Sequence, residues 1–342
     1  MIVLPNLGAE EGRDHVAPPG DAVRAFTWLF GTGARVLGWK GEFGWPEALG
    51  PPPEEPLFDL PGDAFAWLAD AEAQARLRAA GGRPVLAPPE AVMAVHDKAF
   101  AHRAALSTGH LPDCLRGVVE VLEPDAIEPA AVEARVRALP PWAAAAWLLK
   151  PRMGSSGRGG VRRLEHVRGA ADRLRRLGGA VFEPWLRRTE DLSALLLLGR
   201  DGEVRWIGTT RPIVRDSGAY LGNRGVVEAG GRIASGSPRD AALRTAAEDV
   251  ARLAAKRGYF GPLGMDAFAF VGPEGEEVFR PVVEVNARFT MGMVAAGLVS
   301  LALRRGLLQA PAEWVFALDG QPRGAETVVP LGERALLGWK RC

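Results

Sequence analysis

An apolar strand pattern at residues 146–150 runs directly into the glycine-rich segment KPRMGSSGRGG, residues 150–160. Glycine adopts backbone angles that other residues avoid, so such a loop can turn its N–H groups toward a bound anion. The lysine precedes the glycines and no GK[ST] follows, which excludes a Walker A loop. The pattern predicts a phosphate-binding loop at a strand end, with a plain flexible turn as the alternative. The candidate phosphate contacts are Lys150, Gly154, Ser155, Ser156, Gly157 and Gly159.

A second polar pattern lies in the strand-like segment VVEVNAR, residues 282–288. Glu284, Asn286 and Arg288 alternate with small apolar residues, so their side chains should share one face of a strand. Together with Asp266, two carboxylates and one amide oxygen form a donor set suited to Mg²⁺. A salt-bridged strand end is the alternative. Asn286 is one of only three asparagines in the chain.

Lysine is rare in this chain. Of 42 basic residues only five are lysines, and the bias toward arginine, alanine and glycine is typical of GC-rich codon usage. A lysine retained against that bias deserves inspection, because a guanidinium cannot always replace a compact ammonium. Lys98 and Lys150 are two of the five.

Other features exclude several classes of protein. The two cysteines, Cys114 and Cys342, are far apart in the sequence and have no CxxC or Cys-His spacing, which argues against a zinc site or a disulfide scaffold. The N-terminus lacks the pattern of a signal peptide, and no apolar run is long enough to span a membrane. The cytoplasm is therefore the expected location. Basic residues are in excess after residue 149, which would suit a polyanionic ligand, but lysine-rich runs typical of nucleic-acid binding are missing.

The order of the predicted elements indicates a mixed α/β chain. In the first ninety residues, apolar runs at 2–4, 35–39 and 84–87 alternate with helical patterns at 21–30 and 63–80, which favours a small parallel α/β unit. Residues 88–109 should form one helix, bounded by prolines and a glycine. Further strands are predicted at 117–121, 146–150, 180–183, 192–198 and 204–208, and further helices at 130–139 and 238–257.

Five segments in this order resemble the ATP-grasp superfamily. They are the DK pair at 97–98, the Lys150 loop, VFEPWLRRTE at 181–190, GMDAFAF at 264–270 and VVEVNAR at 282–288. The resemblance covers roughly residues 88–299. It implies an ATP-grasp fold of the α/β (α+β) class. An N-terminal parallel α/β domain would span residues 1–88, a lid and central subdomain with the phosphate loop 89–180, and a C-terminal antiparallel-sheet subdomain with the metal site 181–342.

The resemblance also implies roles for individual residues. Lys98 and Lys150 would bind phosphate oxygens of ATP, and Asp266, Glu284 and Asn286 would hold one or two Mg²⁺ ions, or Mn²⁺ in their place. The hinge acid Glu183, with Pro184, Trp185 and Leu186, would meet the adenine, and Glu190 the ribose hydroxyls. Trp185 could equally be a core residue. Arg288 would face the γ-phosphate or an acyl oxyanion.

The segment at 209–225 contains the remaining candidate for substrate binding, Arg211, because arginine binds carboxylate and phosphate oxygens with two parallel hydrogen bonds. An exposed loop with incidental arginines is the alternative. His96 and His102 lack metal-ligand spacing and are expected at a helix surface.

An ATP-dependent carboxylate-amine ligase, working through an acyl phosphate and releasing ADP and phosphate, is the activity that the resemblance favours. A small-molecule kinase on the same fold and a non-catalytic nucleotide-binding protein are the alternatives. The expected partners are a small carboxylate and an amine, such as an amino acid or peptide, without nucleic acid or membrane. A homodimer is left open.

Overall fold

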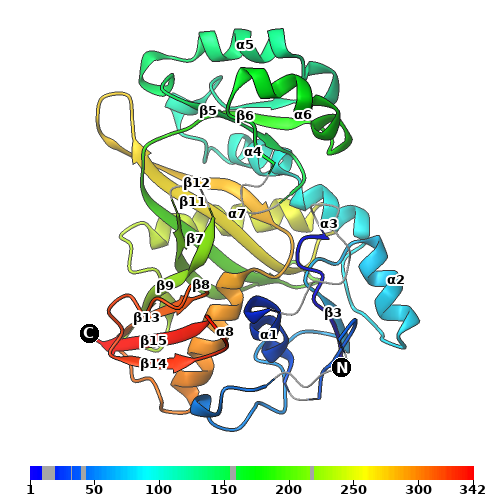
Figure 1. The fold of residues 1–342 in the computed structure, drawn as a ribbon, viewed down its shortest axis with the longest axis vertical. Helices are drawn as coiled ribbons and strands as arrows, with labels where there is room; N and C mark the ends of the chain where they lie inside the picture. Colours follow the sequence, from blue (N-terminus) through cyan, green and yellow to red (C-terminus); the bar gives the residue numbers. More distant parts are fainter. Residues whose placement is uncertain (10–19, 32, 40–43, 155–158, 216–218) are drawn as a thin grey trace.

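The computed structural model describes residues 1–9, 20–31, 33–39, 44–154, 159–215 and 219–342, and their strands form three sheets (Figure 1). A small sheet lies at the top of Figure 1, a large sheet fills the middle, and the N-terminal unit lies beside the lower half of the large sheet. This is the mixed α/β arrangement predicted from the sequence. None of the described helices is long and apolar enough to cross a membrane.

The N-terminal unit is a three-stranded parallel sheet in which β1 (Ile2–Leu4) lies between β2 (Arg35–Val36) and β3 (Ala64–Ala66), with helices α1 (Asp21–Thr27) and α2 (Ala71–Ala79). The predicted helix at 63–80 is wrong in its first half. Residues 64–66 pair with β1 instead, and Asp70 starts α2 by accepting a hydrogen bond from the Ala73 N–H at 2.8 Å. The predicted strand at 84–87 forms a single bridge, between Gly62 and Pro84.

The small sheet has its own hydrophobic core. Its antiparallel strands have the order β4-β6-β5. The elements from residue 89 to 184 are α3 (Pro89–His96), α4 (Lys98–Ser107), β4 (Glu120–Leu122), α5 (Pro129–Ala138), β5 (Trp147–Pro151), α6 (Leu164–Arg176) and β6 (Ala180–Pro184). Phe182, Leu149, Val167 and Leu174 are among the residues of this core, which is separate from the main one.

The helix predicted at 88–109 is instead two helices, α3 and α4. Asp97 has extended backbone angles and caps α4, because its side chain accepts a hydrogen bond from the Ala99 N–H at 2.8 Å. Lys98 is therefore the first residue of a new helix. Helix α6 was not predicted, and the strand expected at 117–121 lies three residues later, at β4.

The large sheet has nine strands in the order β12-β11-β7-β8-β10-β9-β13-β15-β14. Its elements are β7 (Arg188–Leu198), β8 (Val204–Val214), β9 (Tyr220–Val227), β10 (Ile233–Ala234), α7 (Asp240–Ala255), β11 (Gly261–Val271), β12 (Glu277–Asn286), α8 (Met291–Arg304), β13 (Ala312–Ala317), β14 (Thr327–Pro330) and β15 (Leu336–Arg341). Neighbouring strands are antiparallel except β8 and β10. Residues 209–214 and 220–225, for which an exposed loop was the alternative interpretation, belong to the paired strands β8 and β9.

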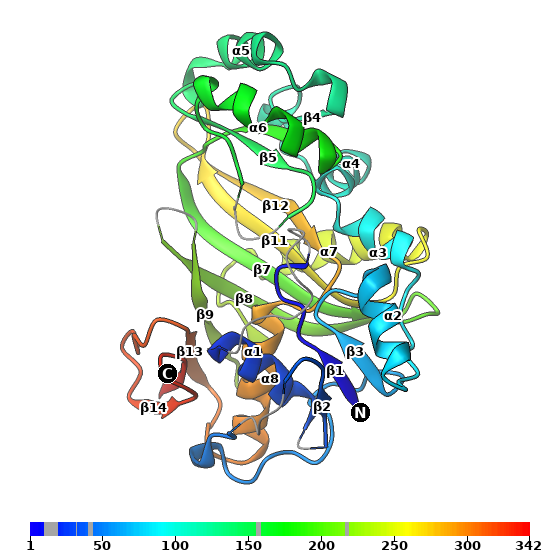
Figure 2. The same cartoon turned by 45° about the vertical axis from the view of Figure 1, so that its right-hand side comes forward.

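The N-terminal unit and the large sheet share the main core. The rings of Phe26 and Phe289 meet edge to face with centroids 5.3 Å apart, and a Cβ at Gly297 of α8 would lie 2.8 Å from Leu29 Cδ2. The Asp21 carboxylate accepts hydrogen bonds from the backbone N–H groups of residues 333, 334 and 335, at 2.8–3.2 Å. Figure 2 shows α8 alongside α1. Segments about three hundred residues apart are thus packed together.

Candidate active site

Four strands of the large sheet carry one continuous row of polar side chains. Glu284 on β12 lies directly opposite Asp266 on β11, Asp266 lies opposite Ser193 on β7, and Ser193 lies opposite Thr210 on β8. Directly opposite residues of antiparallel strands project from the same face. We call the face with this row the inner face and its reverse the outer face. Asn286, two residues after Glu284, also lies on the inner face.

The predicted metal ligands are therefore brought together. The two carboxylate oxygens of Asp266 accept hydrogen bonds from Ser193 Oγ at 3.0 Å and from Asn286 Nδ2 at 3.1 Å. Burial raises the pKa of Asp266 to about 6, and repulsion by the Glu284 carboxylate contributes in the same direction. Two adjacent carboxylates beside an amide group are a hard-oxygen donor set, and a divalent cation between them would cancel their repulsion. These residues fit Mg²⁺.

Lys98 connects this cluster to the glycine-rich loop. Its buried Nζ donates a hydrogen bond to the Gly154 carbonyl oxygen at 2.6 Å and lies 3.3 Å from Glu284 Oε1. The sequence separates these partners by 56 and 186 positions, so only the fold brings them together. Lys98, the glycine-rich loop and β12 thus meet at one point.

Asp97 and Arg152 hold Lys98 in this position. The Arg152 guanidinium binds the Asp97 carboxylate with Nε–O distances of 3.0 and 3.1 Å, and this hydrogen-bonded contact raises the pKa of Arg152. The Lys98 N–H donates to the Arg152 carbonyl oxygen at 3.1 Å. Asp97 therefore caps α4 and ties the first turn of that helix to the residue that follows β5.

Lys150 is part of a buried ion triad. Its Nζ lies 2.5 Å from Glu183 Oε1, and Arg280 Nη1 lies 3.0 Å from Glu183 Oε2. Burial alone would raise the pKa of Glu183, but attraction by the two cations reverses this and lowers it to about 2. Burial lowers the pKa of Lys150, and the carboxylates of Glu183 and Glu284 oppose this change. Arg280 was not predicted, although it lies on β12 four residues before Glu284.

The glycine-rich loop is held at both ends. Leu149 and Val161 form a two-way backbone bridge with N–O distances of 2.8 and 3.0 Å. Gly154 and Gly159 both have positive φ angles, +130° and +73°, which side chains disfavour. The predicted contacts Ser155, Ser156 and Gly157 lie outside the described residues.

The predicted hinge joins β6 to β7. The Trp185 N–H donates to the Ala146 carbonyl oxygen at 2.8 Å, and its half-buried ring lies 3.8 Å from the Arg162 guanidinium carbon and 5.5 Å from that of Arg188. Pro184 and Leu186 on either side are buried. The Trp185 ring therefore packs against the guanidinium groups of Arg162 and Arg188 close to the first residue of β7.

Glu190 and Arg211 do not join this cluster. Glu190 is three residues from Ser193 on a regularly paired part of β7, and Arg211 follows Thr210, so both project from the outer face. There they form an ion pair at 3.0 Å, and Glu190 also accepts hydrogen bonds from Ser237 Oγ at 2.8 Å and Arg239 Nη1 at 3.0 Å.

The neighbouring residue, Asp191, lies on the inner face instead. It is opposite Phe268 and two residues from Ser193, and its carboxylate is 3.0 Å from Arg188 Nη1. Sequence reasoning missed it. The available signal was the pair of adjacent acids, Glu190 and Asp191. Neighbouring residues of a strand project from opposite faces, so one of these two acids had to lie on the inner face.

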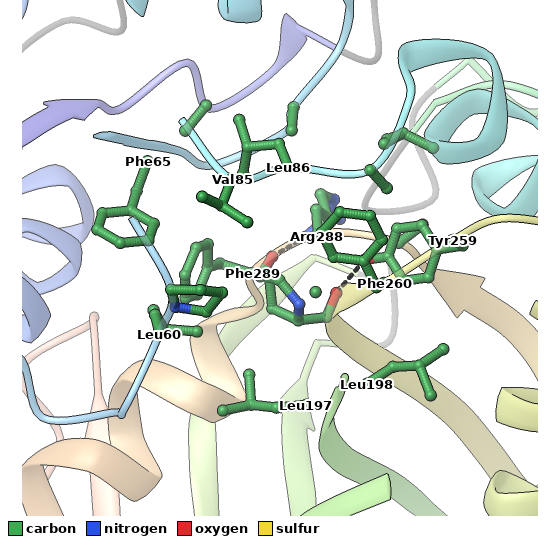
Figure 3. Close-up of a pocket in the computed structure, with 18 of the residues that line it drawn as sticks. Leu60, Phe65, Val85, Leu86, Leu197, Leu198, Tyr259, Phe260, Arg288 and Phe289 are labelled. Atoms are coloured by element: carbon green, nitrogen blue, oxygen red, sulfur yellow. Dashed lines mark hydrogen bonds between the residues drawn. The ribbon is translucent and has the colours of Figure 1, made fainter. Parts of the chain in front are cut away.

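Arg288 is one of the residues that line a small apolar cavity (Figure 3). The cavity has a volume of about 90 Å³ and is lined by Phe65, Val85, Leu197 and Phe289 among others. Arg288 is buried, donates to the Phe289 carbonyl oxygen at 2.8 Å, and has its guanidinium carbon 5.2 Å from the centroid of the Trp67 ring. The cavity is below the range of about 300–1,000 Å³ that is usual for small-molecule sites, so it is too small for a nucleotide.

His96 is buried at the end of α3, and the prediction that it lies at a helix surface is wrong. Burial lowers the pKa of His96 well below its ordinary value, and the nearby charges of Arg288 and Lys98 lower it further. His102, expected at the surface as well, is half-buried. His96 is therefore a buried, neutral residue near the cations Lys98 and Arg288.

Solved structures with this fold include two enzymes. N5-carboxyaminoimidazole synthase from Aspergillus clavatus, in complex with ADP and 5-aminoimidazole ribonucleotide, is 14% identical with a TM-score of 0.51 over 99% of this chain and 92% of its own. A Campylobacter jejuni biotin carboxylase complex is 12% identical with a TM-score of 0.52, over 82% and 71% of the chains. The chain therefore has the ATP-grasp fold predicted from its motifs. No protein-family model and no curated protein matches the sequence.

Proposed function

We propose that this protein is an ATP-dependent ligase that joins a small carboxylate to an amine through an acyl phosphate. The observation that carries the proposal is the position of Lys98, whose ammonium contacts both Gly154 in the glycine-rich loop and Glu284 in the metal strand. The glycine-rich loop is suited to binding phosphate, and the carboxylates and amide are suited to binding Mg²⁺. An ammonium placed between the two could contact the phosphate chain of a bound nucleotide.

ATP would lie between the small β4-β6-β5 sheet and the inner face of the large sheet. Lys98 and Lys150 would contact its phosphate oxygens as point charges, and the backbone around Trp185 would meet its adenine. Asp266, Glu284 and Asn286 would hold Mg²⁺, which when bound supplies charge neutralisation on the phosphates. The fold supports this placement, because the Aspergillus structure contains ADP.

The chemistry requires no protein nucleophile. A substrate carboxylate oxygen attacks the γ-phosphorus, the bond to the β,γ-bridging oxygen breaks, and ADP leaves. The amine then attacks the acyl carbon, phosphate leaves, and the amine proton goes to solvent. Buried Arg288, beside Asp266, would stabilise the negative charge that develops on the acyl oxygen.

A substrate screen tests the proposal. Amino acids and other small carboxylic acids are combined in pairs with ATP and Mg²⁺, while ADP release and product mass are followed. We expect ADP only when an acid and an amine are both present, with a product that has lost one water. A phosphorylated product from a single acceptor would instead identify a kinase, and nucleotide binding without any turnover would leave the non-catalytic alternative.

Two adjacent acids on β7 provide a matched test of nucleotide placement. Asp191, which lies on the inner face, would accept hydrogen bonds from the ribose hydroxyls in place of Glu190. Asp191→Asn should therefore raise the Kd for ATP about 10-fold or more, because a hydrogen bond to a charged group contributes about 1.5–3 kcal/mol. Glu190→Gln should change it less than about threefold, because Glu190 projects from the outer face toward Arg211 and Arg239. Titration calorimetry measures both constants. A larger effect for Glu190→Gln would return the ribose role to Glu190.

A further inference from the structure

A cavity of about 300 Å³ lies on the outer face of the large sheet, away from the residues proposed to bind ATP. Its floor crosses four strands, because Arg211 on β8 lies opposite Arg224 on β9, Arg224 opposite Val315 on β13, and Val315 opposite Gly338 on β15. Arg211 projects from the outer face, so this whole row does so. The strands involved include β13 and β15, drawn in red in Figure 1.

Four cations from different elements line this cavity: Arg211, Arg224, Arg323 and Lys340. Three of them have acidic partners. Arg211 Nη2 is 3.0 Å from Glu190, Lys340 Nζ is 3.1 Å from Glu313, and the Arg323 guanidinium binds both oxygens of Asp319 at 2.9 and 2.6 Å. Within the described residues Arg224 is exposed and has neither a hydrogen bond nor an ion pair. Of the four cations that line the cavity, Arg224 is therefore the one whose charge no described acidic residue compensates.

Two features of this arrangement cost stability. Arg211 and Arg224 are like charges directly opposite each other on neighbouring strands, which is unfavourable, and Glu190 neutralises only Arg211 of the two. Arg323 has a φ of 47°, the one positive value among the described residues other than glycine, and such backbone strain gathers at ligand sites. An anion between the guanidinium groups would offset the repulsion.

We propose that this cavity binds a small molecule through an oxyanion group, a phosphate or a carboxylate, held by Arg224 together with Arg211 and Arg323. A guanidinium matches either group with two parallel hydrogen bonds. The volume, at the lower end of the range for small-molecule sites, admits a compact metabolite. Because the sheet separates this site from the inner face, its ligand would not compete with ATP.

Calorimetric titration of the full chain with sodium pyrophosphate and, separately, with sodium citrate tests the proposal at constant ionic strength without Mg²⁺. We expect one of the two to bind in a saturable manner, which assigns phosphate or carboxylate chemistry. Arg224→Gln should raise its Kd at least 10-fold. Arg224→Lys, which keeps the charge and loses the paired geometry, should give an intermediate value. Arg232→Gln is the matched control, since Arg232 is exposed, paired with Glu228 and outside the cavity.

Three outcomes would overturn the proposal. They are the absence of binding by either anion at 10 mM, the same Kd in Arg224→Gln as in the unaltered protein, and equal weakening by Arg224→Gln and Arg232→Gln. The last would show general attraction of anions to a basic surface. Arg224 is exposed, so its replacement should leave the fold intact, and an unchanged thermal unfolding midpoint checks this. Pyrophosphate that binds only at the lysines of the inner face would be insensitive to Arg224→Gln.

Discussion

Glu284→Gln is expected to lower the rate of ADP formation by 10²-fold or more, equivalent to about 2.7 kcal/mol of barrier. Glu284 is the residue at which the proposed metal ligands and Lys98 meet, and glutamine keeps its shape while removing its charge. The loss should be mainly in kcat, because two effects on stability oppose each other: the variant loses the ion pair with Lys98, and it also loses the repulsion that, together with burial, raises the pKa of Asp266. A coupled ADP assay and thermal unfolding measure the two quantities.

The matched control for this variant is Glu274→Gln, in the exposed turn between β11 and β12. It should change the rate less than about threefold, a barrier change of under about 1 kcal/mol. A Glu284→Gln enzyme that also stays within threefold of the unaltered rate would show that Glu284 does not take part in the reaction, and the proposed ligase would lose its metal site.

Glu183→Gln is expected to reduce the free energy of unfolding by about 3–5 kcal/mol, because it leaves the buried cations Lys150 and Arg280 without their shared carboxylate. The exposed i,i+4 pair of Glu133 and Arg137 supplies the control, and Glu133→Gln should cost at most about 0.5 kcal/mol. Denaturant unfolding at pH 7 measures both variants. Equal effects of the two would mean that the triad contributes nothing beyond a surface pair.

The same variant has an expected pH dependence. The pKa of Glu183 is about 2 in the folded protein against an ordinary value of 4.5, so its ionised form stabilises the fold. That contribution is fully present above about pH 4.5 and is lost as pH falls through about 2. The stability gap between the unaltered protein and Glu183→Gln should therefore narrow over this range. A gap that widens on acidification would contradict the assigned charge state.

The sequence alone was sufficient to predict that Glu284 and Asn286 lie on one strand and share a face, and the reason is geometric. In an extended strand the direction of a side chain depends only on whether its position is odd or even, so Glu284 and Asn286 had to share a face once a strand was recognised. Lys98 and Lys150 could be singled out as candidates because lysine is rare in this chain. The order of the segments then indicated the ATP-grasp fold, which the solved structures confirm.

Other features could not be predicted because they depend on contacts between distant segments. Glu190 was assigned by its distance from Glu183, but its direction is set by where β7 begins and by a register shift at Ala269 and Phe270. Arg280 meets Glu183 across 97 positions. The break between α3 and α4 had a local signal, since Asp97 is a good helix cap, but the apolar pattern continued across it.

The contact between Asp21 and residues 333–335 has a consequence for biosynthesis. A ribosome releases the N-terminal unit long before it makes α8 and the strands that complete the shared core. Until then, apolar side chains such as Phe26 and Phe30 have no partner in Phe289. The nascent chain must therefore keep this surface soluble until Phe289 and residues 333–335 have been synthesised, and the shared core can close only then.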